Sequence, residues 1–158
     1  MAPSLVLLLA FLIGVVCGLR SLTAPAVVAW AAHRGWIDLD HTRLHFMASA
    51  ATVVIFSLFA VVELVADQLP RAPSRTAPPG LIARIVLGAL CGACIAVSGA
   101  QSMVIGAILG VLGGVVGAFG GYQARTRLVK ALHVPDYVIA ILEDALAIGA
   151  GLFLVSRF

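Results

Sequence analysis

The chain has 158 residues, of which 62% are hydrophobic and only 11% are charged. Soluble domains carry roughly 25% charged residues, so this composition excludes a water-soluble globule and indicates an integral membrane protein. The net charge of +3 is typical of the basic loops of a membrane protein, and no nucleic-acid-binding motif accompanies it. We therefore expect one membrane domain over residues 1–158, with the lipid bilayer as a partner and nucleic acid excluded.

The first apolar stretch, residues 4–32, is interrupted at 18–25 by Gly-Leu-Arg-Ser-Leu-Thr-Ala-Pro, which contains Arg20. Two interpretations are open. We favour a single broken helix across the membrane, because interrupted helices leave backbone polar groups that line transporter sites. The alternative is a short span followed by a re-entrant or interfacial helix anchored by Trp30 and Trp36.

Residues 33–45 contain three histidines without the spacing of metal ligands, so we expect a solvated loop there. Four further apolar segments then predict spans at 46–66, 81–99, 103–122 and 136–155. Residues 67–84 are rich in proline and arginine, and residues 123–135 are basic. Because Lys- and Arg-rich loops stay in the cytoplasm, both loops are predicted to be cytoplasmic. The predicted fold is an all-α polytopic membrane bundle of about five transmembrane helices, with a broken or re-entrant first helix. With five spans the N-terminus is cytoplasmic and the C-terminus is outside, whereas a re-entrant segment at 18–32 would move the N-terminus to the other side.

The predicted span at 103–122 is unusually rich in glycine, and many of its glycines are four residues apart. Such a surface lets another helix backbone approach closely, within one subunit or between two. We expect a homo-oligomer, most simply a homodimer, formed through the helix at 106–121. A CxxC pair, Cys91 and Cys94, lies in the preceding apolar segment without a second pair, so buried inert thiols are favoured over redox or metal chemistry.

Several ionisable side chains fall inside the predicted spans or at their ends. A charge near the bilayer centre costs at least ~2.5–3.5 kcal/mol, so such side chains indicate a functional site. Glu63 and Asp67 are four residues apart, so on a helix they share one face. Glu143 and Asp144 are adjacent and point about 100° apart, so we expect one to face a cavity and the other a neighbouring helix or an arginine. The alternative, a salt-bridge lattice, is disfavoured because buried ion pairs contribute little net stability. The ionisable set is Arg20, Glu63, Asp67, Arg84, Arg125, Glu143 and Asp144. The predicted substrate- or ion-binding site comprises Arg20, Glu63, Asp67, Arg125, Glu143 and Asp144.

These residues favour a transporter or channel-like permease for a small solute or ion. One alternative is a membrane enzyme or binding protein acting on lipid phosphates at the cytoplasmic interface through Arg71 and Arg75, although simple positive-inside anchoring explains both arginines equally well. Another is a structural accessory subunit. No HExxH, GxSxG or P-loop motif occurs, so an enzyme is the less favoured class and no cofactor is expected. Whether the cluster holds a metal is left open.

A weak similarity between two parts of the sequence suggests an inverted repeat, which is a common architecture of transporters. Gly18-Leu-Arg-Ser precedes a span with two acids, as Gly121-Tyr-Gln-Ala-Arg125 does. However, both acid pairs are predicted to lie toward the cytoplasmic half, which strict inversion would not give.

Four segments together carry a family resemblance. They are Gly18-Leu-Arg-Ser, Glu63-Leu-Val-Ala-Asp67-Gln-Leu-Pro70 with Pro73-Ser-Arg75-Thr, Gly121-Tyr-Gln-Ala-Arg125, and Glu143-Asp144-Ala-Leu-Ala-Ile. The chain resembles, over nearly its whole length, the bacterial membrane family labelled domain of unknown function 4126. The resemblance implies a multi-pass protein of the bacterial inner membrane, and it implies no activity.

Overall fold

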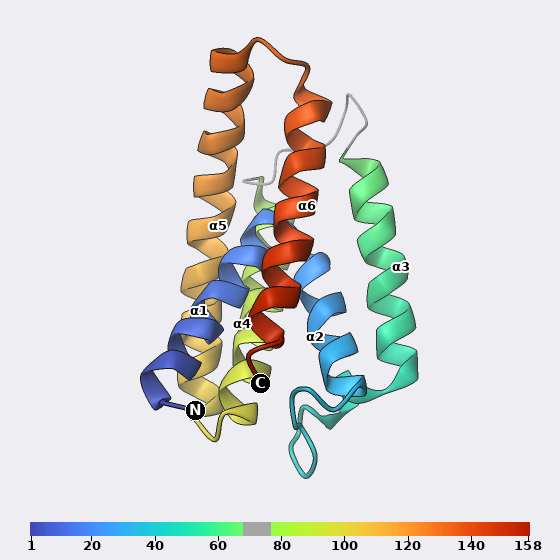
Figure 1. The fold of residues 1–158 in the computed structure, drawn as a ribbon, viewed down its shortest axis with the longest axis vertical. Helices are drawn as coiled ribbons and strands as arrows, with labels where there is room; N and C mark the ends of the chain where they lie inside the picture. Colours follow the sequence, from blue (N-terminus) through green and yellow to red (C-terminus); the bar gives the residue numbers. More distant parts are fainter. Residues whose placement is uncertain (68–76) are drawn as a thin grey trace.

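The computed structural model describes residues 1–67 and 77–158, which form helices and connecting loops without a strand in these two ranges. The helices pack side by side, and both termini lie at the same end of the bundle (Figure 1). The predicted all-α class is confirmed. In chain order the helices are α1 (Pro3–Leu19), α2 (Thr23–His33), a short 3-10 helix η1 (His45–Ala48), α3 (Ala50–Ala66), α4 (Pro78–Ser98), α5 (Met103–Leu132) and α6 (Asp136–Val155).

Local sequence sets most helix ends. The Ser49 hydroxyl caps α3 by accepting a hydrogen bond from the backbone N–H of Thr52 at 3.2 Å. Two prolines, Pro78 and Pro79, occupy the first turn of α4, where a missing N–H costs nothing. The predicted loop over 67–84 is therefore wrong at its C-terminal end, because α4 already begins at residue 78. The rest of that loop, with Arg71 and Arg75, lies mostly outside the described residues.

The predicted loop over 123–135 is also wrong for most of its length. Residues 123–132 continue α5, which ends only where His133 adopts a left-handed conformation (φ 53°). The segment Gln-Ala-Arg-Thr-Arg-Leu-Val-Lys-Ala-Leu consists largely of good helix formers, so its charge marks the exit from an apolar environment and not the end of the helix.

The two segments α1 and α2 run in opposite directions (Figure 1). Near the start of α1, the side chain of Val6 lies beside Gly99 at the end of α4. After α2, the backbone N–H of Asp38 donates to the Ser98 hydroxyl at 3.0 Å. Because the start of α1 and the end of α2 meet the same end of α4, the favoured interpretation of one broken helix is wrong. The chain instead reverses at residues 20–22, which also places the termini together.

Glycines bring α1, α4 and α5 into close contact. A Cβ atom on Gly110 of α5 would overlap the carbonyl of Gly88 on α4, and a Cβ on Gly14 of α1 would overlap the carbonyl of Gly110. Gly113 and Gly117 meet the backbone of α1 in the same way. The glycine-rich face of α5, which includes Gly110, Gly113 and Gly117, therefore packs against other helices of the same chain. The buried glycines of 106–121 thus have partners within the chain, whereas Ile108, Leu112 and Val116 on the same helix are exposed, and a homo-oligomer formed through this helix stays a prediction.

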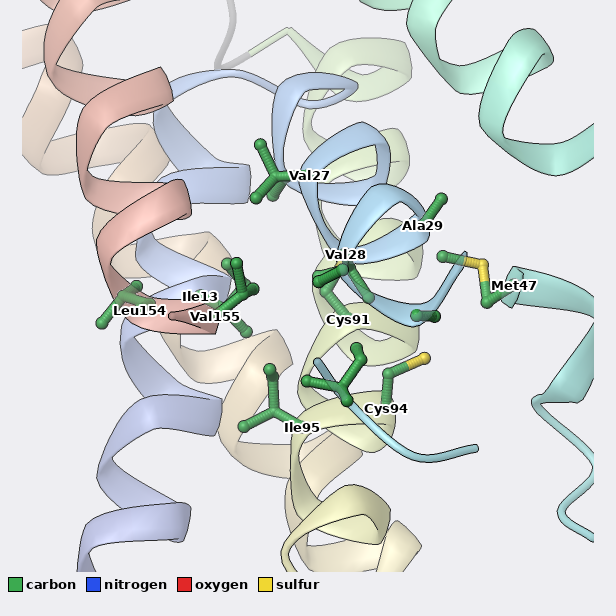
Figure 2. Close-up of a cluster of buried hydrophobic side chains, with 14 of the residues drawn as sticks. Ile13, Val27, Val28, Ala29, Met47, Cys91, Cys94, Ile95, Leu154 and Val155 are labelled. Carbon is green, nitrogen blue, oxygen red and sulfur yellow. The ribbon is translucent and has the colours of Figure 1, made fainter. Parts of the chain in front are cut away.

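A second packing region lies where α1, α2, α4 and α6 meet. Figure 2 shows Ile13, Val28, Ile95 and Val155 converging there, and all four are fully buried. Cys91 and Cys94 are free thiols within the same cluster, as expected from the sequence. The predicted solvated loop after α2 also contributes three buried apolar side chains, so part of it seals this end of the bundle. They are Ile37, Leu39 and Leu44.

Three helices in the described parts of the chain, α4, α5 and α6, are long and apolar enough to cross a membrane. Large apolar side chains such as Leu58, Val104 and Leu146 are exposed on the outside of the bundle, as lipid-facing residues would be. These features support a membrane protein. The predicted count of five spans is not established, because α1 and α3 have 17 residues each, at the lower limit for a span.

Replacing Gly110 by alanine overpacks a filled interior, which usually costs about 1–3 kcal/mol. Alanine recovers ~1 kcal/mol over glycine in a helix, so the free energy of unfolding is expected to fall by up to about 2 kcal/mol. Gly120→Ala is the matched control on the same helix, since no atom of another described element lies within 4 Å of its added Cβ, and it should be neutral or stabilising. Equilibrium unfolding in mixed micelles, followed by circular dichroism, measures both. Equal effects of the two substitutions would contradict this packing.

Candidate functional site

The reversal between α1 and α2 leaves backbone groups without helical partners. The helix α1 ends where Arg20 adopts an extended conformation (φ −136°, ψ 111°). Glu63 of α3 then satisfies the first N–H groups leading into α2. Its Oε1 accepts from the N–H of Ser21 at 2.9 Å, and its Oε2 accepts from the N–H of Leu22 at 2.8 Å. The Ser21 hydroxyl also donates to Oε1. Glu63 therefore caps α2 from another helix, where the helix dipole favours a negative charge.

Arg84 of α4 performs the complementary task for α1. Its Nε donates to the carbonyl of Gly18 at 3.0 Å, near the C-terminal end of α1, and its Nη1 donates to the carbonyl of Gly80 at 2.9 Å. Its Nη2 lies 3.9 Å from Oε1 of Glu63. Thus an acid meets the start of one helix and a base meets the end of the other, and the two side chains are close enough to attract each other.

Arg20 lies at the centre of the cluster and is completely buried. Its Nη1 forms an ion pair with Asp67 at the end of α3, and its Nη2 forms an ion pair with Asp144 of α6. One guanidinium therefore links two helices from different parts of the chain. Within the described residues, its Nε and the hydroxyl of Thr23 are buried without a hydrogen-bond partner. Such atoms are uncommon in native structures and usually indicate a water molecule or another ligand.

Arg125 of α5 forms the outer part of the cluster. Its Nε and Nη2 donate to both oxygens of Asp136, at 2.9 and 2.5 Å. Its Nη1 lies 3.7 Å from Oδ2 of Asp67 and 3.8 Å from Oε2 of Glu143, beyond hydrogen-bond distance of either. The bidentate pair fixes the plane of the guanidinium and leaves Nη1 directed between two carboxylates.

Side-chain exposure decreases along this series of charges. The side chain of Asp136 is 63% exposed, that of Asp67 23%, that of Asp144 13% and that of Arg20 0%. Each of the buried acids has a guanidinium within 4.0 Å, so the cluster meets the requirement that charges in an apolar interior be paired. The arrangement forms a chain of ionic groups that leads from the surface to the middle of the bundle.

A groove adjoins Arg125 between α5 and α6. Its volume is about 170 Å³, and Leu19 of α1 also contributes to it. Apart from Arg125 and Glu143, its walls are aliphatic side chains and glycine. The lining residues are Leu19, Gly121, Ala124, Arg125, Leu128, Ile139, Leu142, Glu143 and Leu146.

The structure brings all six predicted site residues into this cluster. Adjacent acids were expected to point in different directions, and they do: Asp144 meets Arg20, whereas Glu143 faces Arg125 and the groove. Three participants were not assigned to the site from the sequence. Arg84 was noted only as an ionisable residue, Ser21 only as part of a motif, and Asp136 only as the start of a helix. The lipid-phosphate candidates, Arg71 and Arg75, lie outside the described residues.

Within residues 1–67 and 77–158, no group of three or more histidine, cysteine, aspartate or glutamate side chains could hold a metal ion. The carboxylates of the cluster are held apart by the guanidinium groups between them, which suits ion pairing better than metal coordination.

Fold and cluster together define a helical membrane protein with a paired ionic site inside its bundle. The chain belongs to the family described as "Domain of unknown function (DUF4126)", whose model matches residues 7–156. Comparison with curated proteins and with solved structures finds no match.

Glu63→Ala is expected to destabilise the protein by about 2–6 kcal/mol, because the N–H groups of Ser21 and Leu22 lose their acceptor at ~1–3 kcal/mol each. Glu63→Gln retains one acceptor oxygen and should lose less. Thermal unfolding in detergent, combined with hydrogen exchange at Ser21 and Leu22, measures both effects. Asp40→Ala, in the exposed loop after α2, is the control for removing an acid. Unchanged exchange at these two amides in Glu63→Ala would refute the capping role.

Proposed function

We propose that this protein is a permease for a small solute or ion, and that the Arg20-centred cluster is its binding site. The observation that carries the proposal is the completely buried guanidinium of Arg20, which bridges Asp67 of α3 and Asp144 of α6. Charged side chains inside a membrane bundle are costly, and they characteristically mark ion and substrate pathways.

The position of the cluster along the bundle supports this interpretation. Gly18, two residues before Arg20, packs against Gly117 of α5. Gly117 lies about 21 Å along α5 from Met103, at 1.5 Å per residue, and the hydrocarbon core is about 30 Å thick. The exposed Trp30 and Trp36 lie at the other end of α2 and suit a membrane interface. In this placement α2 is re-entrant, and Arg20 lies within the hydrocarbon region.

Access to the cluster is expected from the end formed by the α5–α6 connection. Exposure of the ionic groups increases in that direction, from Arg20 to Asp136. In the opposite direction, glycine contacts and the apolar cluster of Figure 2 fill the bundle. Because the C-terminal part of α5 is basic, the accessible end is proposed to face the cytoplasm of a bacterial inner membrane. This conformation would be the inward-open or inward-occluded one.

The ion pairs offer a simple means of coupling binding to movement. A cation or proton that reaches Asp67 or Asp144 neutralises the carboxylate and weakens its attraction to Arg20. Since these two acids belong to α3 and α6, binding would loosen the link between those helices. The glycine-packed helices α1, α4 and α5 would remain together as the fixed part. Among the described residues, Nε of Arg20 and the Thr23 hydroxyl have no hydrogen-bond partner, so both could bind a small polar ligand or water.

The proposal is tested by currents from proteoliposomes on a solid-supported membrane after concentration jumps of protons, Na⁺, Mg²⁺, phosphate or glutamate. The parent protein should carry at least one of these probes. Asp67→Asn and Asp144→Asn should each reduce that current about ten-fold or more, because each removes one of the charges that hold Arg20. Asp38→Asn, in the exposed loop at the far end, is the matched control. Size-exclusion profiles check that each variant is folded.

Two results would overturn the proposal. One is a parent protein whose currents equal those of empty liposomes for every probe. The other is a folded Asp67→Asn or Asp144→Asn variant with the parent's currents.

A further inference from the structure

Trp30, near the C-terminal end of α2, has an exposed ring that is nevertheless held in position. Its side chain is 42% exposed, and its indole Nε1 donates a hydrogen bond to the hydroxyl of Ser57 on α3 at 3.0 Å. The ring of His33 lies nearly perpendicular to the indole, with 6.4 Å between the ring centroids. Nδ1 of His33 is in turn 2.9 Å from the carbonyl oxygen of Ala48. These contacts fix the indole at the surface between α2 and α3.

The guanidinium of Arg34 lies over this ring, with its carbon atom 5.4 Å from the ring centroid. At such a distance a cation and the face of an indole attract each other. This attraction requires the positive charge and no hydrogen bond, so the N–H donors of the guanidinium stay available. Within the described residues, no acceptor or carboxylate engages these donors. Arg34 is therefore a positioned cation whose hydrogen-bonding capacity is unused.

The acids of the loop after α2 do not neutralise Arg34, because they interact with other groups. A carboxylate oxygen of Asp38 accepts a hydrogen bond from the backbone N–H of Asp40 at 2.9 Å. The carboxylate of Asp40 lies 3.0 Å from Nδ1 of His45. An anion from outside the chain can thus supply the counter-charge of Arg34.

The end of α2 lies at the depth where lipid head groups are expected. The N–H of Asp38, just after α2, donates to the hydroxyl of Ser98 at the end of α4, and α5 begins a few residues later at Met103. From Met103 to Tyr122, the apolar part of α5 is about 28 Å long at 1.5 Å per residue, close to the ~30 Å thickness of the hydrocarbon core. The end of α2 is therefore near one boundary of that layer, where tryptophan is enriched.

An apolar surface leads from this site into the bilayer. Val54 and Val61 lie three residues before and four residues after Ser57, so they share its face of α3, and both are exposed. The helix α3 runs beside α2 from this end of the bundle toward the ionic cluster (Figure 1). A hydrocarbon chain attached to a group at Arg34 can therefore lie along α3.

We propose that Arg34, held over Trp30, binds the phosphate of a glycerophospholipid from the leaflet at this end of the bundle. The non-ester oxygens of a phosphodiester can accept hydrogen bonds from a guanidinium side by side, and its negative charge supplies the counter-ion. The acyl chains would lie against the apolar face of α3. The inference goes beyond transport, because the site would hold a lipid whether or not the chain moves a solute.

Native mass spectrometry of the protein in dodecylmaltoside tests the two parts of the ligand. Phosphatidylglycerol, a diacylglycerol with the same acyl chains, and glycerophosphoglycerol without chains are titrated separately. Phosphatidylglycerol should bind about ten-fold or more tightly than either of the others, because the diacylglycerol lacks the group that pairs with Arg34 and glycerophosphoglycerol lacks the chains.

Two matched pairs of variants locate the site. Arg34→Gln should weaken the binding of phosphatidylglycerol about ten-fold, the effect of losing hydrogen bonds to a charged group. Arg43→Gln removes the same charge from an exposed arginine of the following loop and should leave the affinity unchanged. Trp30→Leu should weaken binding several-fold, because Arg34 would lose the ring that positions it. Trp36→Leu, at another exposed tryptophan, should have no effect.

Three results would overturn the proposal. The first is equal affinity for phosphatidylglycerol and the diacylglycerol, and the second is an Arg34→Gln variant with the parent's affinity. The third is an equal loss in Arg34→Gln and Arg43→Gln, which would indicate attraction by overall charge and not a site. Because Arg34 is exposed, its substitution is expected to leave the fold intact, which circular dichroism checks. The readout is binding alone, so it is independent of the proteoliposome currents.

Discussion

The need to satisfy an interrupted backbone inside an apolar bundle underlies the architecture of this protein. Where α1 ends and α2 begins, N–H and carbonyl groups lose their helical partners, and no bulk water is expected at that depth to replace them. Glu63 and Arg84 provide the missing acceptor and donor from two other helices. Each of these ionised groups is itself costly to bury, but each is stabilised by the helix end that it caps and by the other, 3.9 Å away. The reversal and its charged neighbours therefore stabilise one another.

Two kinds of helix contact with different physical properties hold the bundle together. The helices α1, α4 and α5 approach so closely that added Cβ atoms would overlap backbone, so this part resists any relative movement. By contrast, Arg20 reaches α3 and α6 through ion pairs, whose strength depends on the charge of each carboxylate. A ligand or proton can change the second kind of contact but not the first. The division between a rigid part and a charge-dependent part thus follows from the types of residue at each interface.

Much of this structure was predictable from the sequence, because local rules govern it. Apolar length predicted the helices, and the high cost of membrane charges identified Arg20, its partners Asp67 and Asp144, and the further acids of the cluster, Glu63 and Glu143. The direction of α2 was not predictable, since residues 20–22 can continue or reverse a chain, and their backbone N–H groups are satisfied by Glu63, 41 residues after Leu22. The sequence also could not show which helix packs against the glycine-rich face of α5, because Gly110 presents the same smooth surface to α4 as it would to a second copy. The length of α5 was predicted wrongly for a different reason. Arg125 and Arg127 indicate a polar environment, and a helix that projects beyond the bilayer is in such an environment as much as a loop is.

The position of Arg125 connects the surface end of the ionic cluster with its buried centre. Its guanidinium is held in one plane by Asp136, and the remaining nitrogen points toward Asp67 on one side and Glu143 on the other. Asp67 is also the ion-pair partner of Arg20, so two guanidinium groups from different helices approach the same carboxylate. A ligand or proton that neutralises Asp67 would therefore weaken its attraction to both arginines at once. A change at the partly exposed Asp67 would in this way reach the completely buried Arg20.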